Sequence, residues 1–441
     1  MHLSDLSLQP KFYISISKFM SNRKSTIPKP LPRIARFERL GFGLFVHWGL
    51  YSQLGQGEWI QHQAKIPVKT YEKYFRKFTA KDFDARALVR LAKDAGMRYI
   101  TLTTRHHEGF SLYDTRGLSK FDAPHSPAKR DLVAEFVDAC REEKIVPFLY
   151  HTTLDWRWNS ASLSKVRFNQ YLDYLHASVE VLCRHYGKLG GLWFDGNWSL
   201  PHADWKEDRL YAMIRKHQPE AMIINNTGLG ALGVKGHREI DSTTFEQGLP
   251  SAPDRTGWPK YVAGEMCETM NGHWGTGHRD FNFKSPAEII EHLCGCRKVG
   301  ANYLLNVGPT ATGGLPAYEV AVLRKVGEWV ALHGDLLYEG HPVNIPCQGR
   351  DFLLKKNDRY YYFAHGLARR GDEHVVKKGS GNGPRPIDDF PVKIRSARWL
   401  DENRKARFTQ SADKSLLTLD CEGYIYGNDM VVRVAELAPP P

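Results

Sequence analysis

The feature that most constrains the fold is a regular alternation of short apolar runs with longer amphipathic segments, sustained over about 300 residues. Runs such as 42–46, 99–103 and 191–194 have the length and composition of buried strands. In the segments between them apolar residues recur at helical spacing, as in residues 82–96, where the pattern ends in a glycine. This alternation predicts parallel βα units.

Counting the units predicts eight strands and therefore an α/β fold, a (β/α)8 TIM-like barrel. The strands are expected at residues 42–46, 99–103, 145–150, 191–194, 222–224, 239–242, 261–265 and 303–307. Helices are expected at residues 82–96, 131–144, 165–186, 205–217, 286–299 and 318–333. A doubly wound sheet is the alternative, but no glycine-rich phosphate-binding fingerprint follows the first strand.

The pattern changes near Asp351, after which short alternating strands follow one another without helical segments. They are expected at residues 352–354, 360–364, 392–395, 416–419 and 430–434. This predicts a small C-terminal antiparallel β-sandwich. The expected organisation is an irregular lead-in over 1–34, a catalytic barrel over 35–340 and the β-sandwich over 341–441.

The chain carries 61 Lys and Arg against 49 Asp and Glu, a net charge of +12. The basic residues are scattered, with only short pairs such as Arg369 and Arg370, which indicates a solvated surface and no nucleic-acid partner. The alternative is a preference for an acidic polysaccharide, for example a sulfated one. No apolar run approaches the roughly 20 residues that cross a bilayer, so no membrane association is expected.

Seven cysteines, an odd number, lie mostly within apolar patterns, which favours reduced, buried thiols over disulfides. The N-terminal run 12–19 is short and interrupted by Ser and Lys, unlike a signal peptide. A cytoplasmic protein is expected, or a secreted or periplasmic one if the true start lies elsewhere.

Catalysis in such a barrel takes place at the carboxyl ends of the strands. The residues expected there are almost all polar, ionisable or aromatic: His47, Trp48, His106, His107, Tyr150, Asp195, Asn225, Asn226, Asp241, Glu246, Glu265, Glu268 and Asn306. Asp195 follows an apolar strand and precedes Gly196, which lets the chain turn while the carboxylate faces the barrel mouth. It is a candidate nucleophile, and a helix N-cap is the alternative.

The histidines His47, His106 and His107 can either hold sugar hydroxyls or bind a metal. The absence of a His-x-His or His-Glu-x-x-His spacing argues against a metal site. Several tryptophans, including Trp59, Trp193 and Trp274, lie near the same loops, and part of this set is expected to line a pocket.

Five segments carry a family resemblance: Gly41-Phe-Gly-Leu-Phe-Val-His-Trp-Gly49, Gly57-Glu-Trp59, Thr103-Thr-Arg-His-His-Glu-Gly-Phe110, Leu192-Trp-Phe-Asp-Gly196 and Asn302-Tyr-Leu-Leu-Asn-Val-Gly-Pro309. They resemble the α-L-fucosidases of glycoside hydrolase family 29, in that family's order and spacing, over residues 36–335. The resemblance implies a (β/α)8-like barrel with a C-terminal β-sandwich and no cofactor.

The resemblance also implies roles for individual residues. Asp195 matches the catalytic nucleophile, and Glu246 the acid/base. The positions that hold the fucose hydroxyls and ring are matched by His47, Glu58, His106, His107, Tyr150 and Trp193. The apolar wall that receives the C5-methyl group is matched by Phe45, Trp59 and Trp274.

Some positions depart from the family pattern. Thr227 stands where many members have an arginine, so a cationic contact is missing or comes from elsewhere, with Arg238 as a candidate. The acid/base position varies in the family, which keeps Glu265 and Glu268 open beside Glu246. Thr276 replaces a frequent aromatic residue, so the leaving-group side is expected to differ.

The expected function is that of a retaining exo-α-L-fucosidase that releases terminal fucosyl residues from a glycan or oligosaccharide. The alternatives are an α-L-galactosidase of the same fold, a non-catalytic fucose-binding protein and a metal-dependent barrel hydrolase. Linkage, leaving group and oligomeric state stay open.

Overall fold

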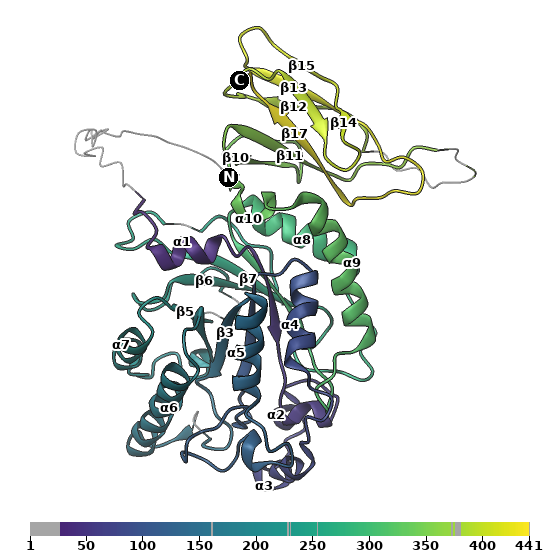
Figure 1. Ribbon diagram of the computed structural model, residues 1–441. Coiled ribbons are helices and arrows are strands. Elements are labelled where there is room, and N and C mark those ends of the chain that lie inside the picture. The colour runs from purple at the N-terminus through teal and green to yellow at the C-terminus, as the bar shows by residue number, and fades with distance from the viewer. Residues whose placement is uncertain are drawn as a thin grey trace, which may run out of the picture.

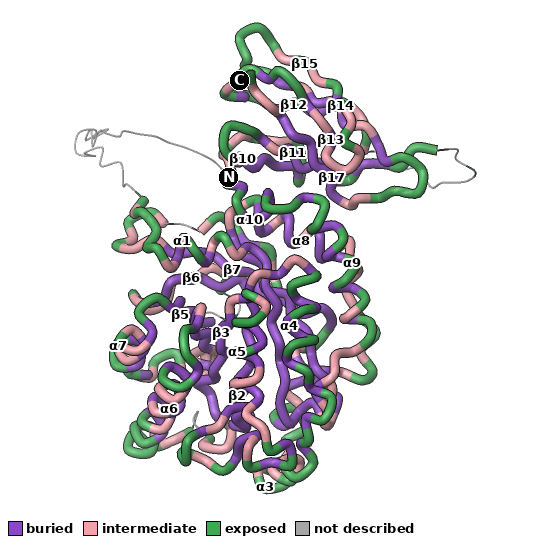
Figure 2. Tube along the Cα trace, viewed as in Figure 1, coloured by how far each residue is buried: buried purple, intermediate pink, exposed green. Residues whose placement is uncertain are grey.

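The computed structural model describes residues 27–159, 162–226, 229, 231–253, 255–371, 374 and 381–440 (Figure 1). Its larger part is a closed barrel of parallel strands in chain order, in which the last strand pairs with the first. The strands are β1 (Phe42–Val46), β2 (Tyr99–Arg105), β3 (Val146–Thr152), β4 (Gly191–Asp195), β5 (Met222–Asn225), β6 (Ser242–Glu246), β7 (Ala263–Thr269) and β8 (Asn302–Val307). The predicted barrel is confirmed, and almost all of its strand residues are buried (Figure 2).

Helices surround the barrel and pack their apolar faces against it (Figure 1). The longer ones are α4 (Ala85–Asp94), α5 (Leu132–Glu143), α6 (Lys165–His185), α7 (Glu207–His217), α8 (Pro286–Lys298) and α9 (Ala317–His333). Short helices are α2 (Ile60–Gln63) and α3 (Val68–Tyr71) after β1, and α10 (Leu336–Glu339) after α9.

Helix starts follow from local capping chemistry. Asp84 and Asp131 accept hydrogen bonds from backbone N–H groups in the first turns of α4 and α5, and Ser285 forms a capping box with Glu288 at the start of α8. Between β5 and β6, and between β6 and β7, the described residues contain no helix. In the part of the chain that the structure describes, the connections before and after β6 are therefore loops.

One end of the barrel is closed by α1 (Pro32–Glu38), whose first residue is a proline, a residue favoured at that position. Ile34 and Phe37 of this helix are buried and belong to the cluster inside the barrel, together with Tyr99 and Phe148. Because α1 covers the amino ends of the strands, the open mouth lies at their carboxyl ends.

The C-terminal region contains two antiparallel sheets with their own apolar core. One has the order β14-β13-β17-β11-β10-β9 and the other β12-β16-β15. Their strands are β9 (His341–Pro342), β10 (Phe352–Lys356), β11 (Arg359–His365), β12 (Gly383–Asp388), β13 (Ser396–Trp399), β14 (Arg404–Lys405), β15 (Phe408–Gln410), β16 (Leu416–Cys421) and β17 (Val432–Ala438). This unit packs on α8 and α9, away from the barrel mouth (Figure 1).

Two predicted strands are wrong in position. Residues 392–395 form no strand, and β6 begins at Ser242, where the predicted strand 239–242 ends. The sequence of β6, Ser-Thr-Thr-Phe-Glu, is too polar to be recognised as a buried strand. Its hydroxyl groups are satisfied inside the protein: Thr243 donates to the carbonyl of Ala263 and Thr244 to the side chain of Asn226.

All seven cysteines are free, and six are buried, in line with the prediction. Within the described chain, no helix has both the length and the apolar character needed to cross a bilayer.

Candidate active site

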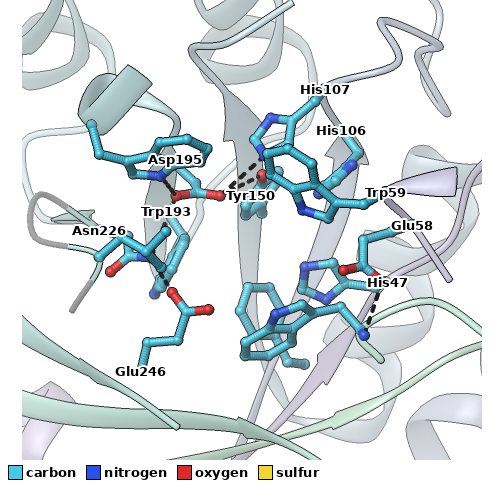
Figure 3. Close-up of a pocket in the computed structure, with 14 residues that line it drawn as sticks. His47, Glu58, Trp59, His106, His107, Tyr150, Trp193, Asp195, Asn226 and Glu246 are labelled. Atoms are coloured by element: carbon cyan, nitrogen blue, oxygen red, sulfur yellow. Dashed lines mark hydrogen bonds and ion pairs between the residues drawn. The ribbon is translucent and has the colours of Figure 1, made fainter. Parts of the chain in front are cut away.

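A pocket of about 150 Å³ opens at the carboxyl ends of the barrel strands (Figure 3). Its volume suits one sugar ring rather than a longer chain. Eleven residues predicted as site residues line it: Phe45, His47, Glu58, Trp59, His106, His107, Tyr150, Trp193, Asp195, Glu246 and Trp274. Three others join them: Asn226, which was expected at a strand end, Trp198, one of the tryptophans near these loops, and Leu229, which the sequence did not single out.

Asp195 ends β4 and points into the pocket (Figure 3). Gly196 follows with φ 114°, and a Cβ there would lie 2.5 Å from the backbone nitrogen of Leu154, so this turn requires glycine. One carboxylate oxygen accepts from the Trp198 indole at 2.8 Å and the other from the Tyr150 hydroxyl at 3.2 Å. Both oxygens therefore face side-chain donors, which excludes the alternative that Asp195 is a helix cap.

The charged form of Asp195 is favoured although the carboxyl group is buried. Burial raises the pKa of this carboxyl group, but the hydrogen bonds from His107, Trp198 and Tyr150 and the charge of His107 outweigh burial and hold the pKa below its usual range. Nε2 of His107 lies 3.5 Å from Oδ2 of Asp195.

Glu246 ends β6 on the opposite side of the pocket, and Asn226 lies between it and Asp195 (Figure 3). The amide nitrogen of Asn226 is 2.6 Å from Oε2 of Glu246 and 3.4 Å from Oδ1 of Asp195, so these two oxygens are at most 6.0 Å apart. Burial, then the negative charge of Asp195, raise the pKa of Glu246 to about 7. The two carboxyl groups thus face each other with opposite pKa shifts.

The two alternative acids lie outside the pocket. Glu265 is buried within the barrel and accepts from the Tyr99 hydroxyl at 2.7 Å and the Trp193 indole at 2.8 Å. Glu268 points outward and contacts His292 of α8 at 2.6 Å. Neither lines the pocket opposite Asp195.

His47 and His106 are neutral bases in this environment. Burial is the main cause that lowers the pKa of His47 to about 3. Burial is also the main cause that lowers the pKa of His106 well below its usual value. Nδ1 of His47 lies 2.7 Å from the side-chain oxygen of Asn306. His106 stacks on Tyr150 with ring centroids 5.8 Å apart.

Glu58 ties two loops together beside the pocket. One carboxylate oxygen accepts from the backbone N–H groups of Trp274 and Gly275, at 2.9 and 2.8 Å. Trp274 packs edge-on against Phe45 with ring centroids 5.7 Å apart, which forms an apolar wall. Trp59 lies elsewhere on the rim, 5.9 Å from the ring of Trp198.

Arg238 does not supply the cationic contact that was expected at the pocket. Thr227 lies outside the described residues, and Arg238 is exposed and paired with Asp208 at 2.7 Å, so it does not replace the missing arginine. No Lys or Arg is found among the described residues that line the pocket. The described part of the chain also contains no group of His, Cys, Asp and Glu arranged to hold a metal.

Asp241, a strand-end candidate, serves the structure instead. It is buried at the start of β6 and pairs with three cations, Arg33 at 3.0 Å, Arg215 at 2.6 Å and Lys260 at 3.0 Å. Burial raises its pKa, but these cations outweigh burial and lower it overall.

Asn226 and Trp198 were expected near the barrel mouth, but their contacts with Asp195 were not. Asn226 stands at a strand end among polar residues, and Trp198 stands three positions after Asp195. Both positions can be identified from the sequence. The contact of both side chains with the Asp195 carboxylate, however, depends on two loops that come together only in the folded protein.

A small aromatic pocket at the mouth of a (β/α)8 barrel, with two facing carboxyl groups whose pKa values are shifted apart, is the arrangement of a glycoside hydrolase.

Comparison with known proteins specifies the family. Residues 11–335 match the family model for α-L-fucosidase. Tissue α-L-fucosidase of Homo sapiens is 28% identical over 396 residues, 83% of this chain and 80% of that protein. Alpha-L-fucosidase isoenzyme 1 from Paenibacillus thiaminolyticus is 30% identical, with a TM-score of 0.78, over 93% of this chain and 99% of that one. A trapped covalent intermediate of a Bacteroides thetaiotaomicron GH29 α-L-fucosidase has a TM-score of 0.78 at 22% identity, over 94% and 97% of the two chains. The chain belongs to the α-L-fucosidase family of glycoside hydrolases.

Proposed function

We propose that this protein is a retaining exo-α-L-fucosidase that releases one terminal α-L-fucosyl residue at a time from a glycan or oligosaccharide. The observation that carries the proposal is the pair formed by Asp195 and Glu246, bridged by the amide of Asn226. Retaining glycosidases place their two carboxyl groups about 5–5.5 Å apart, whereas inverting enzymes leave about 6.5–9.5 Å for a water molecule. An oxygen separation of at most 6.0 Å agrees with the retaining arrangement.

In the first step, Asp195 attacks the anomeric carbon while Glu246 donates its proton to the departing glycosidic oxygen. The bond from the sugar to the leaving group breaks as the bond to Asp195 forms. In the second step, Glu246 takes a proton from water, whose oxygen attacks the same carbon and releases Asp195. Two inversions restore the original configuration.

The opposite pKa shifts support these roles. A nucleophile must be ionised, and the donors around Asp195 lower its pKa. A general acid must carry a proton at neutral pH, and burial together with the charge of Asp195 raises the pKa of Glu246 to about 7. After the ester forms, Asp195 is no longer charged, so the pKa of Glu246 falls, and Glu246, which has given up its proton, stays ionised and can act as the base.

The remaining lining residues support a 6-deoxy sugar. Phe45 and Trp274 offer an apolar surface suited to the C5-methyl group, while His47, His106 and Glu58 supply polar atoms for hydroxyl groups. A covalent intermediate has been trapped in the Bacteroides thetaiotaomicron relative, and a similar ester on Asp195 is the intermediate proposed here.

The test is the hydrolysis of an aryl α-L-fucoside, followed by proton NMR of the first product formed. The wild-type chain is expected to release α-L-fucose first, and Asp195→Asn to lose nearly all activity while its melting curve is unchanged. First release of the β anomer would contradict a retaining mechanism. Faster hydrolysis of the matching L-galactoside would favour the galactosidase, and binding without turnover would favour a non-catalytic protein.

A panel of oligosaccharides that carry fucose in different linkages, with and without sulfate groups, then identifies the leaving-group preference. Turnover confined to sulfated members would favour the acidic polysaccharide suggested by the net charge of +12.

A further inference from the structure

Thr152, the last residue of β3, lies directly behind His107 and does not itself line the pocket. Its hydroxyl oxygen is 2.6 Å from Nδ1 of His107 and 2.6 Å from the carbonyl oxygen of Leu154. The Thr152 side chain is fully buried. These contacts fix where the proton of His107 lies.

A hydroxyl group has one hydrogen, and a carbonyl oxygen can only accept. The hydrogen of Thr152 therefore points to Leu154, because two oxygens 2.6 Å apart require a hydrogen between them. The hydroxyl oxygen must then accept from His107, which places a hydrogen on Nδ1 of that ring.

The other ring nitrogen, Nε2, lies 3.5 Å from Oδ2 of Asp195. With the proton on Nδ1, a neutral ring would direct a lone pair at a carboxylate oxygen, which is repulsive. Nε2 donates to Asp195 only when it carries a second hydrogen, and the ring is then an imidazolium. In a pocket without Lys or Arg among its described lining residues, this ring is the source of positive charge.

A similar arrangement holds His47, on the other side of His106 from His107. Nδ1 of His47 faces the side-chain oxygen of Asn306 at 2.7 Å, and the amide nitrogen of Asn306 donates to the carbonyl of Trp274 at 2.7 Å. Because that carbonyl accepts only, the Asn306 oxygen is the atom that faces His47. The ring of His47 therefore carries its hydrogen on Nδ1 and presents Nε2 as an acceptor.

We propose that Thr152 is a positioning residue that keeps a proton on Nδ1 of His107, so that His107 contacts Asp195 as an imidazolium and supplies the cation of the pocket. Asn306 positions the proton of His47 in the same way, so that His47 accepts a hydrogen bond from a substrate hydroxyl. This inference concerns the free protein, and only its kinetic consequence rests on the proposed function.

The groups that face His107 bear on its charge. The titratable ones are Asp195, His47 and His106. The uncharged rings are Trp59, Trp156 and Trp198. Asp195 is the group in direct contact with Nε2, and its negative charge favours the imidazolium.

Neutron diffraction from deuterium-exchanged crystals of the full chain, at a pD of about 6, tests the proton positions directly. The expected result is deuterium on both nitrogens of His107 and on Nδ1 alone of His47. A bare Nδ1 on His107, or deuterium on its Nδ1 alone, would overturn the inference for that ring. This measurement does not depend on any activity.

Variants test the role of the hydroxyl. Thr152→Val removes the acceptor of the Nδ1 hydrogen with little change of shape, and Thr152→Ser keeps it. Thr101→Val is the matched control, because Thr101 is a buried strand threonine whose hydroxyl has no hydrogen-bond partner. Melting curves establish that each variant folds, and if Thr152→Val does not fold, the neutron measurement decides alone.

Nitrogen NMR of the histidine side chains at the pD of the neutron measurement is expected to show hydrogen on both ring nitrogens of His107 in the wild type. In Thr152→Val it should lie on Nε2 alone, because the acceptor of the Nδ1 hydrogen is gone. The value of kcat/KM should fall about 10- to 100-fold, as for other oriented histidines that lose their supporting partner. Thr152→Ser and Thr101→Val should resemble the wild type. Hydrogen still on Nδ1 of His107 in folded Thr152→Val, or an equal loss of kcat/KM in Thr101→Val, would refute the role. Absence of fucosidase activity in the wild type would refute the proposed function and leave the NMR result standing.

Discussion

The indole N–H of Trp198 offers the most quantitative test of the site. It lies 2.8 Å from Oδ1 of Asp195, closer than the Tyr150 hydroxyl at 3.2 Å or the Asn226 amide at 3.4 Å. A hydrogen bond to a charged group contributes about 1.5–3 kcal/mol. Because it stabilises only the ionised form, its removal shifts the protonation equilibrium of Asp195 by a factor of about 10 to 100.

Trp198→Phe keeps an aromatic ring and removes this donor. Since hydrogen bonds lower the pKa of Asp195, their loss raises it, and the acid limb of kcat/KM moves to higher pH. At a fixed pH below that limb, kcat/KM should fall by about 10- to 100-fold relative to the wild type, while the alkaline limb set by Glu246 stays in place.

The assay is the pH dependence of kcat/KM on an aryl α-L-fucoside. Trp156→Phe is the matched control, because Trp156 packs on Trp59 with ring centroids 5.3 Å apart, and no hydrogen bond from its indole to Asp195 is found. An acid limb at the wild-type position in folded Trp198→Phe would refute the reasoning.

Three further predictions concern Glu246, Asp241 and Phe45. Because burial and Asp195 raise the pKa of Glu246 to about 7, kcat/KM should decline as pH rises through about 7. That alkaline limb should disappear in Glu246→Ala. Azide, attacking the ester on Asp195 in place of water, should restore turnover of activated substrates by this variant and give an α-fucosyl azide. Rescue of Glu265→Ala instead would identify Glu265 as the acid. Asp241→Asn leaves its three cations without their buried partner. The free energy of unfolding measured in urea should therefore fall by about 3–5 kcal/mol, while kcat/KM of the folded fraction stays unchanged. An unchanged urea midpoint would contradict this structural role. Phe45→Leu should reduce the preference for an L-fucoside over the L-galactoside by up to about 10-fold, and an unchanged ratio would exclude Phe45 from the methyl-binding wall.

The barrel was predictable because its strands and helices carry strong local signals. β1, at Phe42–Val46, is an uninterrupted apolar run, and its predicted bounds match those in the structure. β6 was misplaced because its buried residues are hydroxyl-bearing, and the partners that satisfy them belong to β7 and to the residue after β5.

The choice among three glutamates could not be made from local sequence alone. Side chains alternate across a strand, so on β7 Glu265 points inward with Cys267, while Glu268 points out of the barrel. Alternation therefore explains why Glu268 is outside the pocket. It does not distinguish Glu265, which points inward but lies in the layer below the mouth, from Glu246 at the end of its own strand.

The residues that adjust the charge of the site were the least predictable. A threonine at the end of a strand is ordinary, and Thr152 gains its role only because Leu154 and His107 lie on either side of its hydroxyl. A contact among three residues of this kind requires a distant segment, here the one with His107, to lie against the strand end, and no periodic pattern in the sequence predicts it.

The most direct test of the central claim is to trap the covalent intermediate. The protein is incubated with a 2-fluoro-fucosyl fluoride, whose fluorine slows hydrolysis of the sugar–enzyme ester, and is then digested and sequenced by mass spectrometry. The account predicts one fluorofucosyl group per chain, attached to the peptide that contains Asp195 and absent in Asp195→Asn. A label on another carboxylate, or full inactivation without any attached sugar, would contradict it.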